Sequence, residues 1–438
     1  MSHNSRFLAV KILNEFEKKN IQLNLIRNKI FSFYSPTVSS KARVNALTKE
    51  VVRFRGRLDL MIRFISSKPI NQINLSLLSI LRIGFYEIIM DSKTPEYATV
   101  DSSVNLTHNL CSRKAAGFAN AVLRNLIRAR SSKANWDQSL HENPKWHSIP
   151  IWLQKKWKYQ YGEEQFKKLV KDINKQSRMF LRIDVPNDEI AQIQDSLYME
   201  GIKTKINQKN MLKVESNSGK IFNSFSFKSG KISIQDPASS KVVECLTLLK
   251  GDNVLDVCAA PGTKALQLAN LIGDTGLVLA SDIDSKRVLK GKNDIKRHNK
   301  NNIKWFIKDA RKDSFPKVNK ILIDAPCSGT GVISKKPDIR WRRKKSDIKR
   351  FASLQFDIIN HCAQFLNSQG TMVYSTCSIE PEENIDVVKK FLKTNKDFIM
   401  KPVPSSIPSD WVDENGCLKT LPHLHDVDGM FATVLKRL

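Results

Sequence analysis

The sequence has little that would support a disulfide scaffold, a zinc ribbon or a membrane span. Its seven cysteines, at positions 111, 245, 258, 327, 362, 377 and 417, include no CxxC pair. This scatter argues against a disulfide framework or a zinc ribbon and favours a reducing cytosol. The first twenty residues carry charges every few positions, and the most apolar later stretch, LSLLSILRIGFYEIIM, is interrupted by Arg82. We therefore expect no signal peptide and no membrane span, and we predict a cytoplasmic protein.

Acidic residues are also scarce relative to basic ones. The chain has 72 Lys and Arg against 43 Asp and Glu, a formal net charge of +29. Such an imbalance favours a polyanionic partner such as nucleic acid, although solubilising surface charge or a generally basic proteome is an alternative. At 438 residues the chain exceeds what one hydrophobic core usually serves, so two or three domains are expected.

Residues 1–135 are predicted to form an all-α domain. Apolar residues recur there at three- and four-residue spacing, as at Leu75, Leu78, Leu81 and Phe85, which is typical of amphipathic helices. The first 130 residues hold 21 Lys and Arg against 8 Asp and Glu. A helical domain that binds a phosphate backbone fits this charge, and a solvated charged face is the alternative.

The pattern of residues changes twice in the rest of the chain. A Ser-, Asn- and Pro-containing stretch, 131–150, is expected to be a linker, and 150–230 combines helical and alternating patterns, which predicts a small α+β unit. From 231 to 438, short apolar runs alternate with helical segments, which predicts a parallel, doubly wound α/β sheet. The candidate strands are 253–260, 276–284, 303–310, 320–327 and 370–377, with GMFATVLKRL as a candidate closing strand.

The first three candidate strands end in residues that suit a cofactor. The turn CAAPGTKALQLA (258–269) opens a helix, where Gly262 permits close approach of a ligand and the helix N-terminus offers N–H groups to an anion. Asp282 could accept both hydroxyls of a ribose, and Asp309 could contact an adenine edge. Tight turns are common in α/β folds, and single acids are often helix caps or surface charges. The combination nevertheless predicts a site for S-adenosylmethionine beyond the carboxyl ends of the strands.

The fourth and fifth candidate strands end in DAPCS and VYSTCS. Because all five strands are expected to be parallel, Asp324 and Cys377 should face the same crevice as the cofactor methyl group. Cys327 and Cys377 could instead be small buried hydrophobes, the commonest fate of a free cysteine. The turn-forming Pro, Ser, Thr and Gly residues around both cysteines favour a functional pair.

A basic segment lies between these two strands. KKPDIRWRRKKSDIKR (335–350) has nine Lys and Arg against two Asp, with Trp341 among them. This composition predicts RNA contact, with phosphates on the charges and a base stacked on the Trp341 ring. The alternative is an exposed helix start with an anchoring tryptophan.

Six motifs together closely resemble the bacterial 16S ribosomal RNA cytosine-5 methyltransferases of the RsmB (Sun, Fmu) family. They are IQDPASS, VLDVCAAPGTK, SDID, DAPCSGTGVISKKPDIRW, YSTCSIEPEEN and DGMFATVLKR. In the N-terminal part, RIGFYEI (82–88) and FANAVLRN (118–125) are similar to the NusB-like RNA-binding domain of that family. The resemblance implies a Rossmann-like class I methyltransferase domain at 231–438, preceded by a NusB-like domain at 1–135 and the α+β unit at 150–230.

The resemblance also implies roles for individual residues. The set that would bind S-adenosylmethionine is Cys258, Ala259, Ala260, Pro261, Gly262, Thr263, Lys264, Asp282, Asp309 and Asp324. Cys377 would be the nucleophile, and Cys327 would assist product release. The family loop usually runs Gly-Gly-Lys-Thr, so Thr263 and Ala265 are departures, and the β-branched Thr263 could weaken cofactor binding. The segment NKQSRMFLRIDV also lacks the paired prolines common in the family.

The chemistry of cytosine explains why such residues are needed. C5 is a poor nucleophile, so a temporary covalent bond at C6 must first push electron density onto C5. A Cys377 thiolate, with a pKa lowered from about 8.5, would form that bond, and Asp324 would hold the N3 and N4 edge of the base. The base must be unstacked, which suits naked 16S rRNA or an early small-subunit particle. We expect a monomer with no metal and no membrane partner.

Two other classes of protein remain open at the level of sequence. A noncatalytic RNA-binding or assembly factor would need neither the thiols nor the acids at the strand ends. A methyltransferase of another substrate, with tRNA or 23S rRNA as the foremost alternatives, is the second class. An N-methyltransferase needs neither thiol, and DNA cytosine-5 enzymes use the cysteine of a PC motif, so Cys377 in its TC motif discriminates among them.

Overall fold

The computed structural model describes residues 4–91, 94–132, 135–185 and 189–438. Contacts divide the chain into two compact units. Unit 1 comprises Met1–Asn174 and Lys336–Arg343, and unit 2 comprises Lys175–Lys335 and Lys344–Leu438. The short segment 336–343 thus lies between two strands of unit 2 in sequence but packs within unit 1. No helix in the described ranges is both long and apolar enough to cross a membrane.

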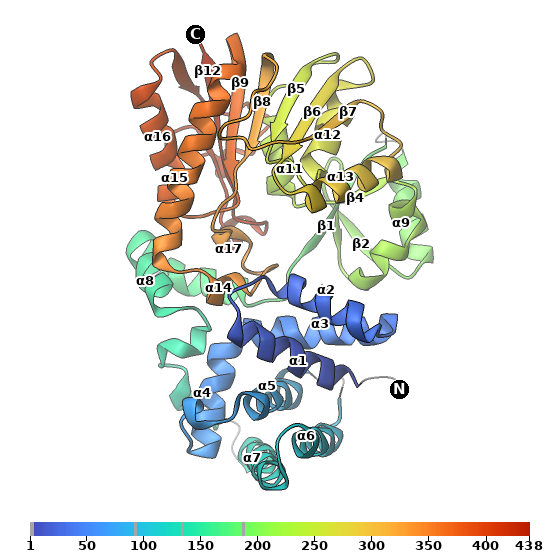
Figure 1. Cartoon of the computed structure of the whole chain (residues 1–438), viewed down its shortest axis with the longest axis vertical. Helices are drawn as coiled ribbons and strands as arrows, with labels where there is room; N and C mark the ends of the chain where they lie inside the picture. The colour runs from blue at the N-terminus through green and yellow to red at the C-terminus, as the bar shows by residue number, and fades with distance from the viewer. Residues whose placement is uncertain (1–3, 92–93, 133–134, 186–188) are drawn as a thin grey trace. The chain divides into compact units, whose positions relative to one another are not determined.

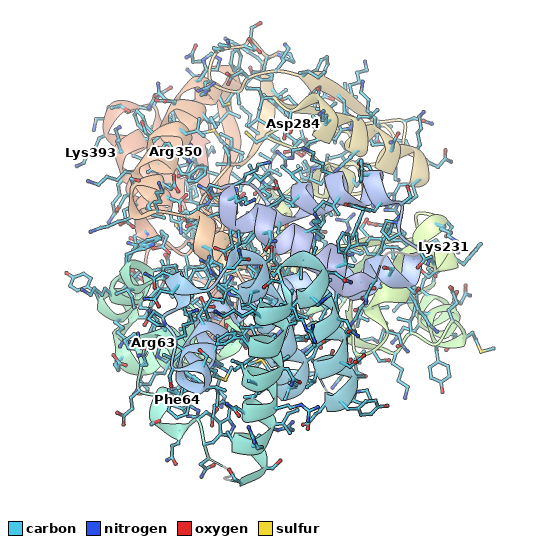
Figure 2. All side chains as sticks on the ribbon, turned by 60° about the horizontal axis from the view of Figure 1, so that its bottom comes forward. Arg63, Phe64, Lys231, Asp284, Arg350 and Lys393 are labelled. Atoms are coloured by element: carbon cyan, nitrogen blue, oxygen red, sulfur yellow. The ribbon has the colours of Figure 1, made fainter. Side chains whose placement is uncertain are left out.

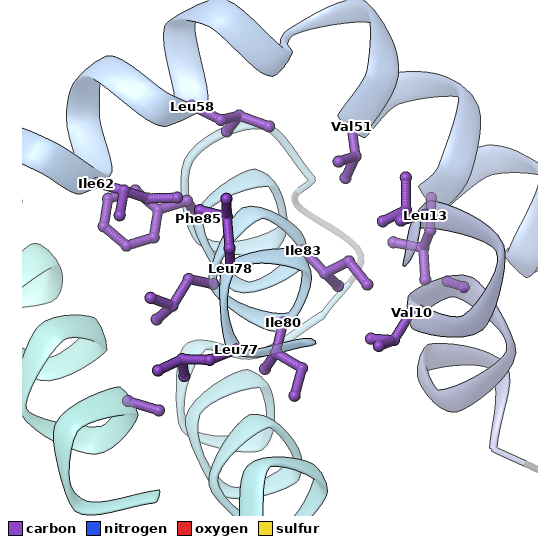
Figure 3. Close-up of a cluster of buried hydrophobic side chains, with 14 of the residues drawn as sticks. Val10, Leu13, Val51, Leu58, Ile62, Leu77, Leu78, Ile80, Ile83 and Phe85 are labelled. Atoms are coloured by element: carbon purple, nitrogen blue, oxygen red, sulfur yellow. The ribbon is translucent and has the colours of Figure 1, made fainter. Parts of the chain in front are cut away.

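Unit 1 is helical throughout its described residues, as predicted. Its helices are α1 (Ser5–Lys18), α2 (Leu23–Tyr34), α3 (Val38–Arg53), α4 (Arg55–Ser66), α5 (Leu75–Met90), α6 (Glu96–Leu110), α7 (Arg113–Ser132), α8 (Ile151–Ile173) and α14 (Ile339–Arg342). Helix α5 is apolar on nearly every side and is buried on most of its surface, so the other helices pack around it. Figure 3 shows side chains of α1, α3 and α4 converging on α5.

The one basic residue in the apolar run of α5 is buried with partners. The Arg82 guanidinium donates to Asp59 at 2.6 and 2.8 Å and to Glu17 at 2.9 Å. A buried charge is tolerated only when it is paired, and these two acids come from α4 and α1. Arg82 therefore links three helices, and the apolar run it interrupts belongs to the core of unit 1.

Unit 2 begins with a small antiparallel sheet. Its elements are β1 (Met179–Ile183), α9 (Ile190–Met199), β2 (Thr204–Gln208), β3 (Met211–Val214), α10 (Phe225–Lys228) and β4 (Ile232–Ile234), and the strand order is β2-β3-β1-β4. Ile193 and Leu197 of α9 pack against Leu181 and Leu212 of the sheet. This is the α+β arrangement predicted, although contacts group α8 with unit 1.

The larger sheet of unit 2 has strand order β10-β12-β9-β8-β5-β6-β7, with β11 paired to β12. Its strands are β5 (Asn253–Val257), β6 (Leu277–Asp282), β7 (Ile303–Ile307), β8 (Val318–Asp324), β9 (Leu366–Thr376), β10 (Phe398–Lys401), β11 (Leu418–Lys419) and β12 (Phe431–Arg437). Strands β5 to β9 are mutually parallel, whereas β12 runs antiparallel to β9. The five predicted parallel strands and the closing strand are confirmed.

Helices cover both faces of this sheet (Figure 1). Alternate strand residues point to opposite faces, so Val254 and Leu322 pack with α11 (Pro237–Glu244) and α12 (Thr263–Ile272). On the other face, strand residues pack with α15 (Lys345–Cys362) and α16 (Ile385–Thr394). The chain order reverses between neighbouring β5 and β8, and ligands of doubly wound sheets bind beyond the carboxyl ends at such a point. The predicted Rossmann-like fold is therefore confirmed, and its carboxyl edge is where a site is expected.

Candidate active site

The two cysteines that end DAPC and STC lie side by side. Cys327 follows β8 and Cys377 follows β9, and their Sγ atoms are 3.2 Å apart. The neighbouring strands are parallel and in register up to Asp324 and Ser375, so both chains leave the sheet at the same edge. The structure thus brings together the thiols that the sequence placed fifty residues apart.

The other described cysteines are simple core residues or nearly so. Burial raises the pKa of Cys245 and of Cys362 to about 12 and that of Cys417 to about 11. Burial also raises the pKa of Cys258, which lies in the predicted cofactor loop. These thiols stay protonated at neutral pH and are poor nucleophiles, because the thiolate is the reactive form.

Asp324, the last residue of β8, is paired with a lysine of the cofactor loop. Lys264 Nζ lies 2.7 Å from Asp324 Oδ2, and Ser375 Oγ donates to Asp324 Oδ1 at 3.2 Å. Burial lowers the pKa of Lys264, but the charges of Asp324 and of Cys377 more than offset this, so the net shift is upward. A protonated Lys264 therefore lies in the electrostatic field of both the acid and the thiol.

A carboxyl group that the sequence analysis missed lies beneath this pair. Asp256 in β5 is fully buried, and neither side-chain oxygen has a hydrogen-bond partner among the described residues. Burial, reinforced by the charge of Asp324, raises the pKa of Asp256 well above its usual range. Burying a polar group without a hydrogen-bond partner costs free energy. Asp256 therefore makes the interior beneath the loop polar. Its position in the apolar pattern VLDV was the available signal.

The predicted cofactor loop 258–264 connects β5 to α12 in a backbone conformation that requires glycine. Gly262 has φ +108°, and a Cβ there would lie 2.9 Å from the Trp305 ring. Gly262 is also the N-cap of α12 and offers no side chain to cap the helix, so the first N–H groups of α12 are open to an anion. Thr263 is the first helical residue and is not among those with positive φ. The Thr departure therefore introduces no backbone strain.

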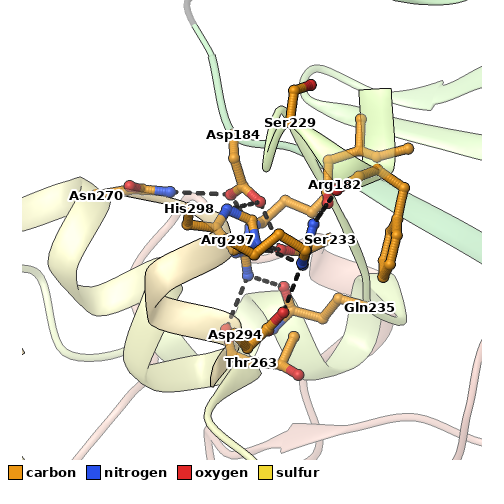
Figure 4. A network of polar contacts seen from close by, with 12 residues as sticks. Arg182, Asp184, Ser229, Ser233, Gln235, Thr263, Asn270, Asp294, Arg297 and His298 are labelled. Atoms are coloured by element: carbon orange, nitrogen blue, oxygen red, sulfur yellow. Dashed lines mark hydrogen bonds and ion pairs between the residues drawn. The ribbon is translucent and has the colours of Figure 1, made fainter. Parts of the chain in front are cut away.

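A buried network beneath α12 supports the loop from the small sheet (Figure 4). The Arg182 guanidinium of β1 donates to the Thr263 carbonyl at 3.1 Å and to Asp184 at 2.7 Å, and it also bonds Gln235. Asp184 in turn accepts from Asn270 of α12 at 2.9 Å. The small sheet thus has a structural part in shaping the site, which its sequence pattern did not reveal.

Asp282, at the end of β6, holds the same loop from the other side. Its carboxylate accepts from the Ala260 N–H at 3.1 Å and from the Asp284 N–H at 3.0 Å. Arg287 lies 3.0 Å from the same carboxylate and also donates to the Ala260 carbonyl. Ala259 and Pro261 flank the tethered Ala260. Arg287 is a further residue that the sequence analysis missed, although its place one turn into the helix after SDID is suggestive.

Asp309, beyond β7, forms a bidentate pair with a neighbour. Arg311 donates to its two oxygens at 2.9 and 2.6 Å. This hydrogen bonding lowers the pKa of Asp309 to about 2, so the group is a carboxylate at neutral pH. Asp309 therefore lies at the predicted strand end, but part of its accepting capacity is already used by Arg311.

A second buried ion cluster joins three motifs of the sheet edge. Lys335 Nζ lies 2.7 Å from Asp236 and 2.6 Å from Asp428. Burial and the charge of Asp236 raise the pKa of Asp428 to about 7. These residues come from IQDPASS, SKKPDIRW and DGMFATV, so motifs distant in sequence meet here. None of the described His, Cys, Asp and Glu residues form a cluster of three or more suited to a metal ion.

The segment around Trp341 does not present its ring for base stacking. Trp341 is half-buried against the core of unit 1, and its indole N–H donates to the Val52 carbonyl at 2.7 Å. Arg340 is fully buried and donates to the carbonyls of Arg53 and Ile173 at 2.9 and 2.8 Å. The expectation of a stacking platform was therefore wrong, and the alternative of an anchoring tryptophan describes the segment better. The reason is that these donors satisfy backbone carbonyls at the ends of α3 and α8.

The residues present fit S-adenosylmethionine. The uncapped N-terminus of α12 suits a carboxylate, and Asp282 and Asp309 lie at successive strand ends where a ribose and an adenine would follow. The buried, unpartnered Asp256 supplies an observation independent of the motifs.

Comparison with known proteins gives the same family over the whole chain. Three family descriptions match: 16S rRNA methyltransferase RsmB/F at 243–436, the NusB family at 3–128, and a ferredoxin-like domain of RsmF/B-like methyltransferases at 149–215. The probable ribosomal RNA small subunit methyltransferase B of Bacillus subtilis (strain 168) is 28% identical over 446 residues, covering 99% of this chain and 98% of that protein.

A second relative and a solved structure extend this similarity. The ribosomal RNA small subunit methyltransferase B of Vibrio vulnificus (strain YJ016) is 30% identical over 406 residues, covering 91% of this chain and 92% of that protein. The crystal structure of PH0851 matches with a TM-score of 0.79 at 22% identity over the full length of both chains, which bears on the fold. The strand order, the loop after β5 and the full-length relatives agree, and the chain belongs to the RsmB family of S-adenosylmethionine-dependent ribosomal RNA small subunit methyltransferases.

Proposed function

We propose that this protein methylates C5 of one cytosine in 16S rRNA through a transient bond between Cys377 Sγ and C6 of the base. The observation that carries the proposal is the pair of thiols, 3.2 Å apart, at the edge of the sheet where Asp324 and Lys264 also lie. A methyltransferase acting on nitrogen or oxygen would need neither thiol. A cytosine-5 enzyme needs a nucleophile for C6 because C5 alone is too weakly nucleophilic.

The hydrogen bond between the thiols supports different roles for them. The bond with Cys377, together with burial, raises the pKa of Cys327 well above its usual range. We assign the donor role and the proton of this bond to Cys327, and the attacking, negatively charged form to Cys377. The ammonium of Lys264 interacts favourably with that charge, and a nearby cation is the usual means of stabilising a thiolate.

In this mechanism Cys377 attacks C6 and Asp324 accepts a hydrogen bond from the N4 edge of the base. Bond formation at C6 makes C5 an enamine-like carbon; S-adenosylmethionine, when bound, would supply the methyl group for it and would leave as the neutral thioether S-adenosylhomocysteine. Solvent water then accepts the C5 proton, the C5–H electron pair forms the C5=C6 double bond, and the C6–S bond breaks as Cys377 departs with its own electron pair. The Cys327 S–H is placed to hydrogen-bond to the departing sulfur and lower its basicity. Cys327 is thus a release residue in this scheme.

We further propose the cofactor contacts from the position of each residue. The loop of Cys258, Ala259, Ala260, Pro261, Gly262, Thr263 and Lys264, with the N-terminus of α12, would hold the methionine carboxylate. Asp282 would bind the ribose, Asp309 the adenine edge, and Asp324 would border the transferred methyl group. Asp282, which is almost fully buried, has its oxygens fixed by three donors, so it can receive ribose hydroxyls without reorganising.

The RNA-binding part of the proposal rests on the helical domain and on charge. We propose the domain limits 1–135, 150–230 and 231–438, and the match of 3–128 to the NusB family supports the first of them. Exposed basic side chains such as Arg63, Arg350 and Lys393 (Figure 2) offer phosphate contacts. We propose a monomer that acts in the cytoplasm on naked 16S rRNA or an early small-subunit particle.

The test is methyl transfer from radiolabelled S-adenosylmethionine to naked 16S rRNA, with tRNA and 23S rRNA as competing substrates. We expect 16S rRNA to be labelled and Cys377→Ala to abolish labelling, whereas Cys111→Ala, a half-buried thiol of unit 1, retains it. Bisulfite mapping of rRNA from a deletion strain would then name the cytosine. Full activity of Cys377→Ala would overturn the nucleophile assignment, and labelling of only tRNA or 23S rRNA would overturn the substrate.

A further inference from the structure

Each of the two cysteines is followed by a serine, and both serines bond one buried carboxylate. The hydroxyl of Ser328 donates to Glu383 Oε2, and the hydroxyl of Ser378 donates to the same oxygen at 2.6 Å. The two hydroxyl oxygens are themselves 3.1 Å apart. Glu383 therefore contacts the residue next to Cys327 and the residue next to Cys377 at once.

Glu383 accepts from four donors in all and has no exposed surface. Its Oε1 accepts from the Ser328 N–H at 2.7 Å and from the Gln355 side-chain amide at 3.1 Å. A carboxylate is an acceptor with no donor of its own, so four converging donors match its ionised form. Burial raises the pKa of Glu383, and the hydrogen bonds from Ser328, Ser378 and Gln355 oppose that shift without cancelling it.

Further hydrogen bonds fix the residues on either side of each cysteine. Gln355 of α15, which itself bonds Glu383, donates to the Pro326 carbonyl at 3.0 Å, so Cys327 lies between one residue held by Gln355 and one held by Glu383. On the other loop, Asn384 accepts from Thr376 Oγ1 at 2.5 Å and donates to the Ser378 carbonyl at 2.9 Å. The residues before and after each cysteine are thus fixed. Glu383 bonds both loops, and the loops also bond each other directly, with the Gly331 N–H donating to the Cys377 carbonyl at 3.0 Å.

We propose that Glu383 is a positioning residue whose carboxylate, through Ser328 and Ser378, sets the separation and direction of the Cys327 and Cys377 thiols. The inference rests on the proposed function, because it concerns how the two thiols of that mechanism are held. Among the described residues, Glu383 forms no hydrogen bond with the loop 258–264, Asp282 or Asp309, so in this proposal it acts on the thiols and not on the cofactor.

The test substitution is Glu383→Gln, which keeps the size of the side chain. An amide has one accepting oxygen and one donating NH2, so two of the four donors lose their acceptor whichever way the amide turns. Misplacement of a reacting group by about 1 Å lowers the rate by about 10²-fold. We therefore expect kcat on 16S rRNA to fall by about 10²-fold, with KM for S-adenosylmethionine unchanged. The control is Glu382→Gln, the same change one residue earlier at a half-buried position, which should keep the wild-type kcat.

A second measurement reports the distance between the thiols directly. Diamide oxidises two thiols to a disulfide and is itself reduced to a hydrazine, taking up the two protons and two electrons. Because the sulfur atoms are 3.2 Å apart, we expect rapid formation of a Cys327–Cys377 bond, detected by mass spectrometry after tryptic digestion. Glu383→Gln should slow this reaction by about tenfold or more while Glu382→Gln does not, an order-of-magnitude effect of lost orientation.

Unfolding and a double-mutant comparison separate positioning from loss of fold. Cofactor binding and the thermal midpoint of Glu383→Gln are measured first, and Ser378→Ala serves as the milder variant if Glu383→Gln does not fold. The free-energy changes calculated from kcat for Ser378→Ala and for Glu383→Gln should be less than additive in the double variant, because both substitutions remove the same interaction.

Three outcomes are then distinguishable. Loss of activity in Cys377→Ala together with wild-type kcat and oxidation rate in a folded Glu383→Gln would overturn the positioning role alone. Full activity of Cys377→Ala would overturn the proposed function on which it rests. Loss of kcat with slowed thiol oxidation and unchanged cofactor KM is the expected result and supports both.

Discussion

Removal of the Cys327 thiol tests the proposed release step most directly. In the structure Cys327 Sγ lies 3.2 Å from Cys377 Sγ, and its raised pKa suits the donor role proposed for it. Hydrogen bonds to charged groups contribute about 1.5–3 kcal/mol, and a thiol is a weak donor. We take about 1–2 kcal/mol for the loss in Cys327→Ala, which corresponds to about 5- to 30-fold slower departure of Cys377 from C6. The covalent protein–RNA adduct should therefore accumulate.

The assay is a single-turnover reaction with 16S rRNA, quenched in denaturant and resolved on a denaturing gel. We expect an adduct band for Cys327→Ala, little for the wild type or Cys111→Ala, and none for the double variant that also lacks Cys377. Cys327→Ser should recover part of the rate, since a hydroxyl can also donate. Wild-type turnover of Cys327→Ala with no adduct would refute the release role.

Four further substitutions have expected outcomes. Lys264→Met removes the partner of Asp324 and the cation near Cys377, so kcat should fall by about 10²-fold and iodoacetamide should alkylate Cys377 more slowly at pH 7. Gly262→Ala places a Cβ at φ +108° and 2.9 Å from a ring; the strain of about 1–3 kcal/mol should weaken cofactor binding by about tenfold or more in calorimetry. Arg311 lowers the pKa of Asp309 to about 2. The ionised Asp309 therefore stabilises the folded state fully at pH values above its usual pKa, and this stabilisation disappears as the pH falls from about 4 toward 2. In urea unfolding, Asp309→Asn should thus cost about 1 kcal/mol at pH 7, a value reduced for the half-exposed Arg311, and the difference from wild type should shrink by pH 3. Arg340→Met leaves helix-end carbonyls without their donor and should lower the free energy of unfolding by about 1–3 kcal/mol, measured against exposed Lys344→Met.

The placement of the thiols could be predicted because it depends on topology alone. Once DAPCS and STCS are assigned to the ends of neighbouring parallel strands, both cysteines must leave the sheet at the same edge. The same reasoning located Asp282, Asp309 and Asp324 at the ends of β6, β7 and β8. What the strand pattern could not supply was the partner of each acid, since Lys264, Arg287 and Arg311 are chosen by side-chain reach after folding.

Charge patterning was a weaker guide, and Arg340 shows the physical reason. A guanidinium can bind a phosphate in solvent or backbone carbonyls in a core, and the sequence is the same in either case. Here Arg340 donates to Arg53 and Ile173, the final residues of α3 and α8. The last carbonyls of a helix lack intrahelical partners and lie at the negative end of its dipole, so they compete with RNA for arginine. Net charge therefore indicated the partner class but not the residues that bind it.

Glu383 illustrates a similar limit within the site and suggests how to recognise such residues. The motif YSTCSIEPEEN contains three glutamates close to Cys377, and any of them could be solvent-exposed by composition. Only the geometry shows that Ser328 and Ser378, the residues following the two cysteines, meet at the Glu383 carboxylate. Since an ionised group with no exposure requires donors from fixed positions, a buried glutamate that bonds the neighbours of both reactive residues is a constraint on their separation. A search for functional residues should therefore include any buried group that bonds the residues next to the reactive side chains.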